Sequence, residues 1–385
     1  MSSSDVRVDR FQFHQLRIPF KTAFRHASAE RTETETVWIE AVATDGVIGF
    51  GESCPRPYVT GESLDTAAAF VSEHEAALRR AVTSLDTLRA WTAEHEDDIN
   101  ANPAAWCALE MAVLDVLGKR GGVPIEALLS LPSLAGTKFR YTAVLGDASP
   151  DAFHAMAERY RAAGFRDFKV KLSGDSERDR RKMAVFNKWN DDSIRVRGDA
   201  NNLWPNADEA IAGLRSLDYS FFAIEEPILT ERHSELPLIA QALNCTIVLD
   251  ESFVRRDQVI RLREPRSQWL INVRVSKMGG VIRSLAIIEL ARALGVQVIV
   301  GAQVGETSLL TRAALTVARA ADEILVAQEG AFGTFLLERD ICDPPLMFAN
   351  AGVLDASAHP MLTRPGLGLS PVDVTAVRTV WRRPD

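Results

Sequence analysis

Residues 168–201 of the chain read FKVKLSGDSERDRRKMAVFNKWNDDSIRVRGDAN. This stretch begins with a short strand-like run, passes through a longer segment with helical character, and ends with a second strand-like run. Because parallel neighbouring strands need a long crossover connection, which is usually a helix, this order predicts two parallel strands joined by a helix.

The same unit repeats on both sides of this stretch, at a spacing of roughly 25 to 30 residues. Short apolar runs of this kind are typical of parallel strands that are buried on both faces. Eight such units within about 190 residues favour a closed barrel over an open, doubly wound sheet. The eight predicted strands are Phe139–Leu145, Phe168–Leu172, Ile194–Gly198, Phe221–Glu225, Thr246–Asp250, Trp269–Ser276, Val296–Val300 and Glu323–Ala327.

The sequence outside these repeats predicts a second, smaller unit. The chain has 385 residues, and at about 150 residues per domain this allows a barrel plus another unit. The first 135 residues mix a hairpin, Val37–Ala43 with Val47–Gly51, and two helices, Ser63–Val82 and Ala104–Lys119, the second with Asn102 as its N-cap. The turn-rich tail ends in a strand-like run, Val372–Trp381. We therefore predict an α+β domain over 1–135, a barrel over 136–341 and a segment over 342–385 that returns to the first domain.

The composition is that of an ordinary soluble globular protein. A formal net charge of −8 without a basic tract argues against a nucleic acid or an anionic membrane as partner. No run of about 18 apolar residues predicts a membrane span, and the N-terminus has no secretion signal. The four cysteines show no Cys-x-x-Cys spacing and predict free thiols. We expect a cytoplasmic protein.

Charged residues stand at or near the ends of successive predicted strands. Active sites of such barrels lie at the C-terminal ends of the strands. From Lys171 onward, the steps to Asp199, Glu225, Asp250 and Lys277 are 28, 26, 25 and 27 residues, which is one strand–helix unit each. A single charged residue at a strand end is most simply explained as a loop residue that faces water. A series with the same spacing as the strands instead predicts one shared site.

Three converging carboxylates repel one another unless a hard cation lies between them. The series therefore predicts Mg²⁺, with Mn²⁺ as the alternative. A lysine near a divalent cation has a lowered pKa and can carry protons near neutral pH. The ion would stabilise the oxyanion formed when a proton leaves the carbon beside a carboxylate. Glu306, in the loop after the seventh strand, is a further acid or hydrogen-bond partner.

At these positions the chain resembles the enolase superfamily, in its muconate-lactonising subgroup. The resemblance implies a modified (β/α)₈ TIM-type barrel, (β/α)₇β, with an α+β capping domain formed by the N-terminal region and the C-terminal tail. It covers nearly the whole chain and rests on Gly49-Phe50-Gly51-Glu52-Ser53, Ala108-Leu109-Glu110-Met111-Ala112, Lys169-Val170-Lys171, Asp199-Ala200-Asn201, Ile224-Glu225-Glu226-Pro227, Asp250-Glu251-Ser252 and Lys277-Met278-Gly279-Gly280.

The resemblance implies a role for each of these residues. Lys171 and Lys277 would be the acid/base pair on opposite faces of the substrate, and Lys169 would hold the substrate carboxylate and depress the pKa of Lys171. The mandelate-racemase branch has a histidine at the seventh strand end, whereas Val296 to Glu306 contains none. The metal ligands would be Asp199, Glu225 and Asp250, supported by Asn201, Glu251 and Glu306.

Specificity in this subgroup comes from two capping-domain loops and the eighth strand. We expect the loops to be 19–26 and 54–62, with Arg25, His26, Arg56 and Tyr58 as candidate contacts, although loop charges facing water are equally consistent. Gln303 and Glu329 are further candidates. Dipeptide epimerases of the subgroup carry Asp-x-Asp after the eighth strand. Because this chain has Gln328-Glu329-Gly330 there, a substrate with a free ammonium is disfavoured, with Glu329 as a partial substitute.

The implied activity is that of an isomerase acting on a small-molecule carboxylate by α-proton abstraction. Racemisation or epimerisation of an amino-acid derivative is the simplest outcome, and cycloisomerisation of the muconate type and syn-dehydration to a succinylbenzoate-like product remain alternatives. Two alternatives belong to other functional classes. One is a catalytically inactive barrel that only binds a ligand, and the other is a metal-dependent aldolase or hydrolase. Because members of this family form rings of subunits, the resemblance also implies a homo-oligomer.

Overall fold

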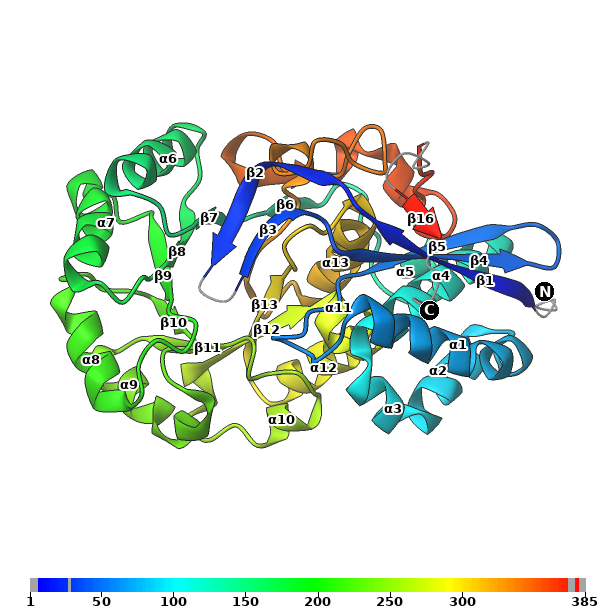
Figure 1. The fold of residues 1–385 in the computed structure, drawn as a ribbon, viewed down its shortest axis with the longest axis horizontal. Helices are drawn as coiled ribbons and strands as arrows, with labels where there is room; N and C mark the ends of the chain where they lie inside the picture. The colour runs from blue at the N-terminus through cyan, green and yellow to red at the C-terminus, as the bar shows by residue number, and fades with distance from the viewer. Residues whose placement is uncertain (1–5, 27–28, 373–377, 381–385) are drawn as a thin grey trace.

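The computed structural model describes residues 6–26, 29–372 and 378–380, and it has two parts (Figure 1). The first is an antiparallel sheet with the strand order β16-β1-β4-β5. Its strands are β1 (Val8–Leu16), β4 (Thr36–Ala43), β5 (Ile48–Ser53) and β16 (Arg378–Val380). The predicted hairpin is therefore confirmed as β4–β5. Of the predicted last strand, residues 378–380 pair with β1, and residues 373–377 and 381 lie outside the described part of the chain.

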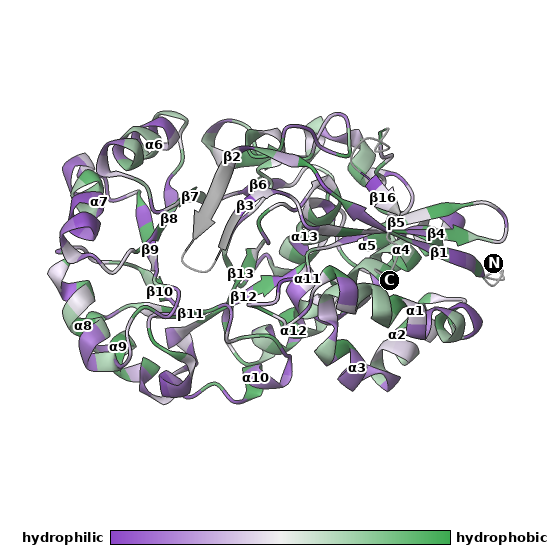
Figure 2. Ribbon diagram, in the orientation of Figure 1, coloured by the Kyte–Doolittle hydropathy of each residue, from purple (hydrophilic) through white to green (hydrophobic). Residues whose placement is uncertain are grey.

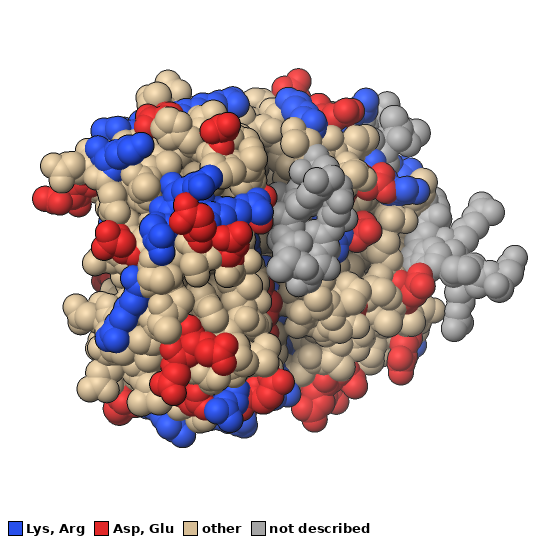
Figure 3. All heavy atoms as spheres, turned by 60° about the vertical axis from the view of Figure 1, so that its left-hand side comes forward, with Lys and Arg blue, Asp and Glu red and all other residues tan. Residues whose placement is uncertain are grey.

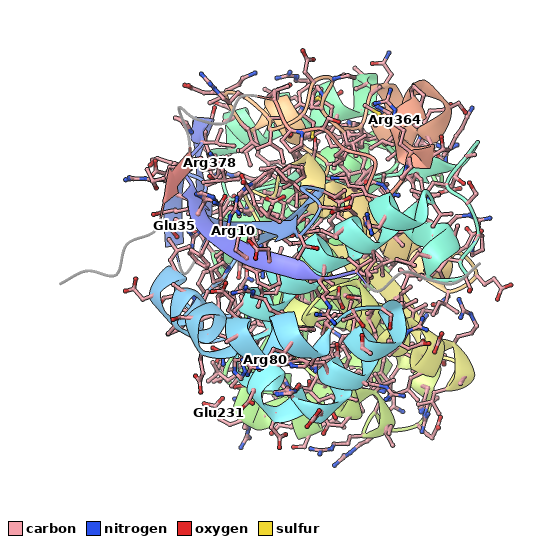
Figure 4. The ribbon with its side chains drawn as sticks, turned by 90° about the vertical axis from the view of Figure 1, so that its right-hand side faces the viewer. Arg10, Glu35, Arg80, Glu231, Arg364 and Arg378 are labelled. Atoms are coloured by element: carbon pink, nitrogen blue, oxygen red, sulfur yellow. The ribbon has the colours of Figure 1, made fainter. Side chains whose placement is uncertain are left out.

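Helices cover one face of this sheet, as Figure 4 shows from the side where Arg80 on α1 and Arg378 at the sheet edge are labelled. The helices that pack on the sheet are α1 (Leu64–Ala81) and α4 (Pro103–Gly121), whereas α2 (Leu85–Glu94), α3 (Glu96–Ala101) and α5 (Ile125–Leu128) pack against α4. Both long predicted helices, now α1 and α4, are present. The predicted N-cap Asn102 makes no side-chain cap hydrogen bond. Instead, the carboxylate of Glu62 accepts hydrogen bonds from the backbone N–H groups of Ala104 and Ala105, each at 2.9 Å.

The contact between α4 and β5 depends on glycine. A Cβ atom at Gly51 would lie 1.8 Å from the carbonyl oxygen of Ala108, and one at Gly49 would lie 2.1 Å from that of Ala112. Both distances are far below van der Waals contact, so no other residue fits this packing without movement of the helix.

The second part is a curled sheet of eight parallel strands in the order β14-β13-β12-β11-β10-β9-β8-β7. The eight predicted strands are all present, with one correction: the first run divides into β6 (Lys138–Arg140), which pairs with β15 (Val353–Asp355), and β7. At the seam, the N–H of Thr142 donates to the carbonyl of Gln328 at 2.8 Å. The strands are β7 (Ala143–Leu145), β8 (Asp167–Lys171), β9 (Arg195–Asp199), β10 (Ala223–Glu225), β11 (Thr246–Leu249), β12 (Trp269–Arg274), β13 (Gln297–Gly301) and β14 (Leu325–Gln328).

Helices follow most of these strands and surround the sheet (Figure 1). Figure 2 shows hydrophobic and hydrophilic residues alternating around α6 to α9, as expected for helices with one face on the sheet and one in water. The helices are α6 (Pro150–Ala162), α7 (Ser176–Trp189), α8 (Ala207–Ser216), α9 (Leu236–Leu243), α10 (Asp257–Ile260), α11 (Val275–Met278), α12 (Val281–Ala293) and α13 (Ser308–Ala321). Short 3₁₀ segments are η1 (Thr230–Glu235), η2 (Arg266–Gln268), η3 (Gly333–Phe335), η4 (Asn350–Gly352), η5 (Ala356–Ala358) and η6 (Pro360–Thr363).

Two buried carboxylates join the two parts of the molecule. Glu52 of β5 accepts hydrogen bonds from the N–H groups of Thr307 and Leu310 at 2.8 and 2.9 Å, where α13 begins. Glu110 of α4 accepts from the N–H groups of Val281 and Ile282 at 2.6 and 3.0 Å, where α12 begins. Helix N-termini favour negative charge because their first N–H groups have no partner within the helix. These bonds fix the start of the helices that follow β12 and β13.

The remaining hairpin, β2 (Pro19–His26) with β3 (Ala29–Glu33), extends from the first part toward the barrel (Figure 1). Two backbone hydrogen bonds anchor its base: Lys21 N–H donates to the carbonyl of Leu336 at 2.8 Å, and Glu338 N–H donates to that of Pro19 at 2.9 Å. In the described part of the chain, no helix is both long and apolar enough to cross a membrane. The four cysteines are free.

Candidate active site

The predicted charged residues meet at the C-terminal edge of the parallel sheet. Lys171, Asp199 and Glu225 end β8, β9 and β10, and Asp250 follows β11 directly. The predicted strand 269–276 is corrected: β12 ends at Arg274, and Lys277 lies on the short helix α11 that follows it.

On one side of the site, two lysines share one carboxylate oxygen. Lys169 Nζ lies 2.9 Å from Asp199 Oδ2 and 2.8 Å from Glu225 Oε1. Lys171 Nζ lies 2.6 Å from the same oxygen of Asp199 and 2.8 Å from Oδ1 of Asn201. Since side chains two residues apart on a strand point to the same face, Lys169 and Lys171 reach the same cluster.

These ion pairs determine the charges on this side. Burial acts to lower the pKa of Lys169, but Asp199 and Glu225 raise it above its ordinary value. Burial acts to raise the pKa of Asp199, but Lys169 and Lys171 hold it well below its usual range. Lys169 is therefore a fixed positive charge beside a fixed negative one, which suits it to bind an anion and not to remove a proton.

On the other side, Lys277 is enclosed by oxygen atoms. Its Nζ lies 2.8 Å from Asp250 Oδ1, 2.6 Å from the carbonyl of Asp250 and 2.9 Å from that of Asn272. The guanidinium of Arg274 pairs with the second carboxylate oxygen of Asp250 and donates to Gln303 Oε1 at 3.0 Å. Burial, aided by the charge of Arg274, holds the pKa of Lys277 below its ordinary value.

Glu226 holds the loop that carries Asp250. Its Oε1 accepts hydrogen bonds from the N–H of Asp250 at 2.7 Å and from the N–H and Oγ of Ser252 at 3.0 and 2.6 Å. Glu226 and Asn201 have φ values of +41° and +45°, which non-glycine residues rarely adopt. Such strained backbone clusters at functional sites. Glu226 was predicted only as part of a motif, without this role.

The residues present fit a hard divalent cation. Asp199, Glu225 and Asp250 offer only carboxylate oxygens, the ligand type that Mg²⁺ prefers. Oε2 of the fully buried Glu225 has no hydrogen-bond partner, and Nε of Arg197 lies 3.9 Å from it. Among the described residues, no three His, Cys, Asp or Glu side chains are already grouped closely enough to hold a metal ion. Asp199 and Asp250 instead contact lysine or arginine, so binding requires these cations to be displaced.

A second layer of charge lies beneath the site and was not predicted. The fully buried Arg197, two residues before Asp199 on β9, pairs with Glu329 and lies 3.2 Å from Asp167 Oδ1. Against the effect of burial, Lys169 and Arg197 lower the pKa of Glu329 to about 2. Glu329 is thus ionised, but the cations of the barrel already neutralise it. The two-residue spacing from Asp199 was the signal that could have identified Arg197.

A cavity of about 1070 Å³ opens over this edge of the sheet. Figure 3 shows a narrow cleft down one face of the molecule, with acidic and basic side chains interspersed beside it. Lys277 and the predicted metal ligands lie beneath the cavity wall and not on it. The predicted site residues that line it are Tyr58, Lys169, Lys171, Asn201, Glu251, Gln303, Glu306 and Glu329, joined by the unpredicted Arg274.

Two acids that line the cavity have raised pKa values. Burial raises the pKa of Glu251 to about 7, with Asp199 adding to the effect. Burial raises the pKa of Glu306 to about 8, although the N–H of Gln303 donates to it at 2.6 Å. Asn201 Nδ2 lies 3.5 Å from Glu251 Oε1, which links Glu251 to the Lys171 side of the site.

Of the remaining specificity candidates, Arg56 does not line the cavity. Arg56 is fully buried and donates to the carbonyls of Glu35, Pro55 and Val304 at 2.9, 2.8 and 2.7 Å, so it braces the junction between the two parts. The side chains of Arg25 and His26 lie outside the described residues.

Two family models match the chain. Residues 6–130 match the mandelate racemase/muconate lactonizing enzyme N-terminal domain, and residues 152–374 match the enolase C-terminal domain-like family. The chain belongs to the mandelate racemase/muconate lactonizing enzyme family. The predicted superfamily and the predicted barrel with a separate N-terminal domain are confirmed.

The curated relatives of this family member are isomerases. It is 26% identical over 374 residues to L-Ala-D/L-Glu epimerase of Bacillus subtilis, covering 94% of this chain and 97% of that protein. It is 25% identical over 350 residues to muconate cycloisomerase 1 of Acinetobacter baylyi, covering 89% and 91%. The predicted enzyme class, an isomerase of the enolase superfamily, is confirmed.

Solved structures of the family share the fold. Muconate lactonizing enzyme from Pseudomonas fluorescens, complexed with muconolactone, superposes with a TM-score of 0.85 at 23% identity, covering 98% of this chain and 100% of that one. Dipeptide epimerase from Cytophaga hutchinsonii, complexed with Mg and the dipeptide D-Ala-L-Val, superposes with a TM-score of 0.82 at 24% identity, covering 98% and 99%.

Proposed function

We propose that this protein is a Mg²⁺-dependent isomerase that removes the proton on the carbon beside a carboxylate and returns a proton to that carbon. The observation that carries this proposal is that a lysine pairs with a carboxylate at each end of the strand-end series: Lys171 contacts Asp199, and Lys277 contacts Asp250. A substrate bound between them would present one face of its α-carbon to each amine.

Asp199, Glu225 and Asp250 are the proposed metal ligands, on the strength of their shared edge and the unpartnered oxygen of Glu225. When bound, the ion supplies positive charge that stabilises the enolate oxygen. Lys169, held as an ammonium by Asp199 and Glu225, orients the substrate carboxylate and keeps positive charge beside Lys171.

Proton transfer in this proposal is the work of the two amines. Nζ of one lysine takes the α-proton, and Nζ of the other delivers a proton to the opposite face, so the configuration at the carbon inverts. Racemisation or epimerisation of an amino-acid derivative is therefore the proposed outcome. The epimerases among the relatives, and N-succinyl-L-Arg/Lys racemase of Bacillus cereus at 21% identity over 314 residues (81% of this chain, 84% of that protein), support it.

The test is hydrogen exchange at the α-carbon. The purified protein is incubated in D₂O with Mg²⁺ and each enantiomer of N-acyl amino acids, with dipeptides and with muconate, and loss of the α-hydrogen is followed by NMR. We expect metal-dependent exchange on at least one class. Lys171→Ala and Lys277→Ala should each suppress exchange of a different enantiomer, by about 100-fold or more.

The exposed Lys138 provides a matched control, since Lys138→Ala should leave exchange unchanged. Full turnover of both enantiomers by Lys277→Ala would exclude the two-base mechanism. The absence of both Mg²⁺ binding and exchange would overturn the proposal. We also propose that the enzyme is cytoplasmic and that it forms a homo-oligomer. Light scattering on the purified protein tests the oligomeric state.

A further inference from the structure

The cavity has two chemically different ends. The end over the sheet carries the charged residues described above, including Lys169, Lys171 and Arg274. The other end lies between α6 and the segment 331–350 that follows β14, and we call it the apolar arm. Its large side chains are Phe153, Met156, Tyr160, Phe332, Phe335 and Phe348.

A cluster of aromatic rings forms the wall of the apolar arm. The ring of Phe348 stacks on Phe335 with centroids 5.3 Å apart, and it meets Phe332 and Phe165 edge-on at 5.3 and 5.4 Å. Because these rings support one another, the wall is preformed and does not have to be ordered by a ligand. No long helix follows β14 in this segment, so loop residues and η3 supply the wall.

The apolar arm exposes large apolar side chains. Phe335 is 54% exposed and Met156 is 42% exposed, although both line a cavity of about 1070 Å³. Ligand pockets for drug-sized molecules span about 300–1,000 Å³, so this cavity has room for more than a small amino acid. Exposed apolar surface that is continuous with a charged site is typical of a binding surface for an amphipathic ligand.

The cavity offers little to an ammonium group. None of the described lining residues of α6 or of 331–350 is acidic, and Arg159 is the charged one among them. Glu329 is neutralised by Arg197 and Lys169. Asp147, at the edge of α6, lies 2.8 Å from Lys182 and 3.0 Å from Arg178.

We propose that the apolar arm binds a large apolar substituent of the substrate, an aryl group or a medium-chain acyl group, and that the α-nitrogen of the substrate is acylated and uncharged. The carboxylate would lie at the charged end of the cavity and the apolar group between α6 and 331–350. The position of the carboxylate in this inference rests on the proposed function. The apolar substituent and the uncharged nitrogen rest on the residues that line the cavity.

The test is equilibrium binding, which does not require turnover. Isothermal titration calorimetry in the presence of Mg²⁺ compares N-octanoyl-L-alanine with N-acetyl-L-alanine, two ligands that differ only in chain length. We expect the octanoyl compound to bind at least tenfold more tightly. Ala152→Trp, which places an indole in the arm from the exposed start of α6, should abolish this preference and leave binding of the acetyl compound unchanged.

Ala155→Trp is the matched control, because Ala155 is exposed on the same helix but does not line the cavity. Equal binding of the two ligands, or a preference that survives Ala152→Trp, would overturn the proposed arm. Tighter binding of L-phenylalanine, whose α-nitrogen is a free ammonium, than of N-acetyl-L-phenylalanine would overturn the acylated nitrogen. A retained octanoyl preference without any α-proton exchange would instead contradict the proposed function and leave the arm standing.

Discussion

Lys277 contacts Asp250 twice: its Nζ lies 2.8 Å from the side-chain oxygen Oδ1 and 2.6 Å from the main-chain carbonyl. The position of the amine is therefore set by the backbone as well as by a charge. The other carboxylate oxygen of Asp250 is paired with Arg274. One buried carboxylate thus pairs with two buried basic side chains, so its removal should affect both.

Asp250→Asn should destabilise the protein and abolish Mg²⁺ binding. The change keeps the shape of the side chain but leaves Lys277 and Arg274 without their anionic partner, and removing one member of a buried ion pair costs about 3–5 kcal/mol. Urea denaturation and Mg²⁺ titration calorimetry measure the two effects. Asp257→Asn, at a half-exposed position, is the control. Unchanged stability would show that Asp250 does not carry this charge balance.

Removal of Mg²⁺ should leave the protein folded. Asp199 and Asp250 have lysine or arginine partners in this structure, so the fold does not depend on the ion. We expect the EDTA-treated protein to keep its near-UV circular dichroism, and saturating Mg²⁺ to raise Tm, since a ligand at 100 times its Kd adds about 2.7 kcal/mol. Asp199→Asn should lose the Tm shift and the exposed Asp322→Asn should keep it. Unfolding by EDTA alone would contradict this account.

Glu110 should make stability depend on pH. Burial raises its pKa from 4.5 to about 8, although two N–H groups donate to it. Since the folded state binds this proton more tightly than the unfolded chain, the contribution to stability is complete below about pH 4.5 and is lost as the pH rises through about 8. Between about pH 5 and pH 8, the free energy of unfolding of the wild type should therefore fall by about 1–3 kcal/mol relative to Glu110→Gln.

Glu126 gives the opposite case as a control for that pH series. Despite burial, Arg312 holds the pKa of Glu126 below its usual value, so this group does not titrate in the same window. The stability of Glu126→Gln should run parallel to that of the wild type between about pH 5 and pH 8. If Glu110→Gln also ran parallel to the wild type, the raised pKa of Glu110 would be refuted.

Gly51→Ala should destabilise the N-terminal domain. The new methyl group would lie 1.8 Å from the carbonyl of Ala108, so α4 must move away from β5. Overpacking of this kind costs about 1–3 kcal/mol, and backbone on both sides allows little relief. Gly121→Ala at the end of α4, where the nearest atom is 3.5 Å away, is the matched control. Thermal unfolding of both variants measures the effect. An unchanged Tm for Gly51→Ala would show that α4 and β5 pack less tightly than in this structure.

The strand positions and the residues at their ends were predictable because both follow from repetition along the chain. Arg197 and Arg274 lie within predicted strands, so a prediction based on residues at the strand ends does not include them, although Arg197 precedes Asp199 by the two residues that place side chains on one face. Arg56 was one candidate substrate contact, with a loop charge facing water as the alternative, but it is buried and donates to the carbonyl of Val304. That partner is 248 residues away, and no local pattern reveals it.

The first strand shows a similar limit. Residues 139–145 form one apolar run in the sequence, yet β6 pairs with β15, more than 200 residues later, before the chain enters the barrel as β7. The placement of Lys277 on α11 rather than on a strand depends on how the chain turns after Arg274. Both features are determined by tertiary contacts.

The two carboxylates at the starts of α12 and α13 have a consequence for recombination between homologues. Glu52 and Glu110 belong to the N-terminal part, whereas the N–H groups that they satisfy belong to the barrel. A chimera that joins the N-terminal domain of one relative to the barrel of another must therefore preserve an acceptor at both positions, or it buries unpaired N–H groups at the starts of α12 and α13. Separate family models match the two parts of the chain, but these hydrogen bonds prevent one part from being exchanged independently of the other.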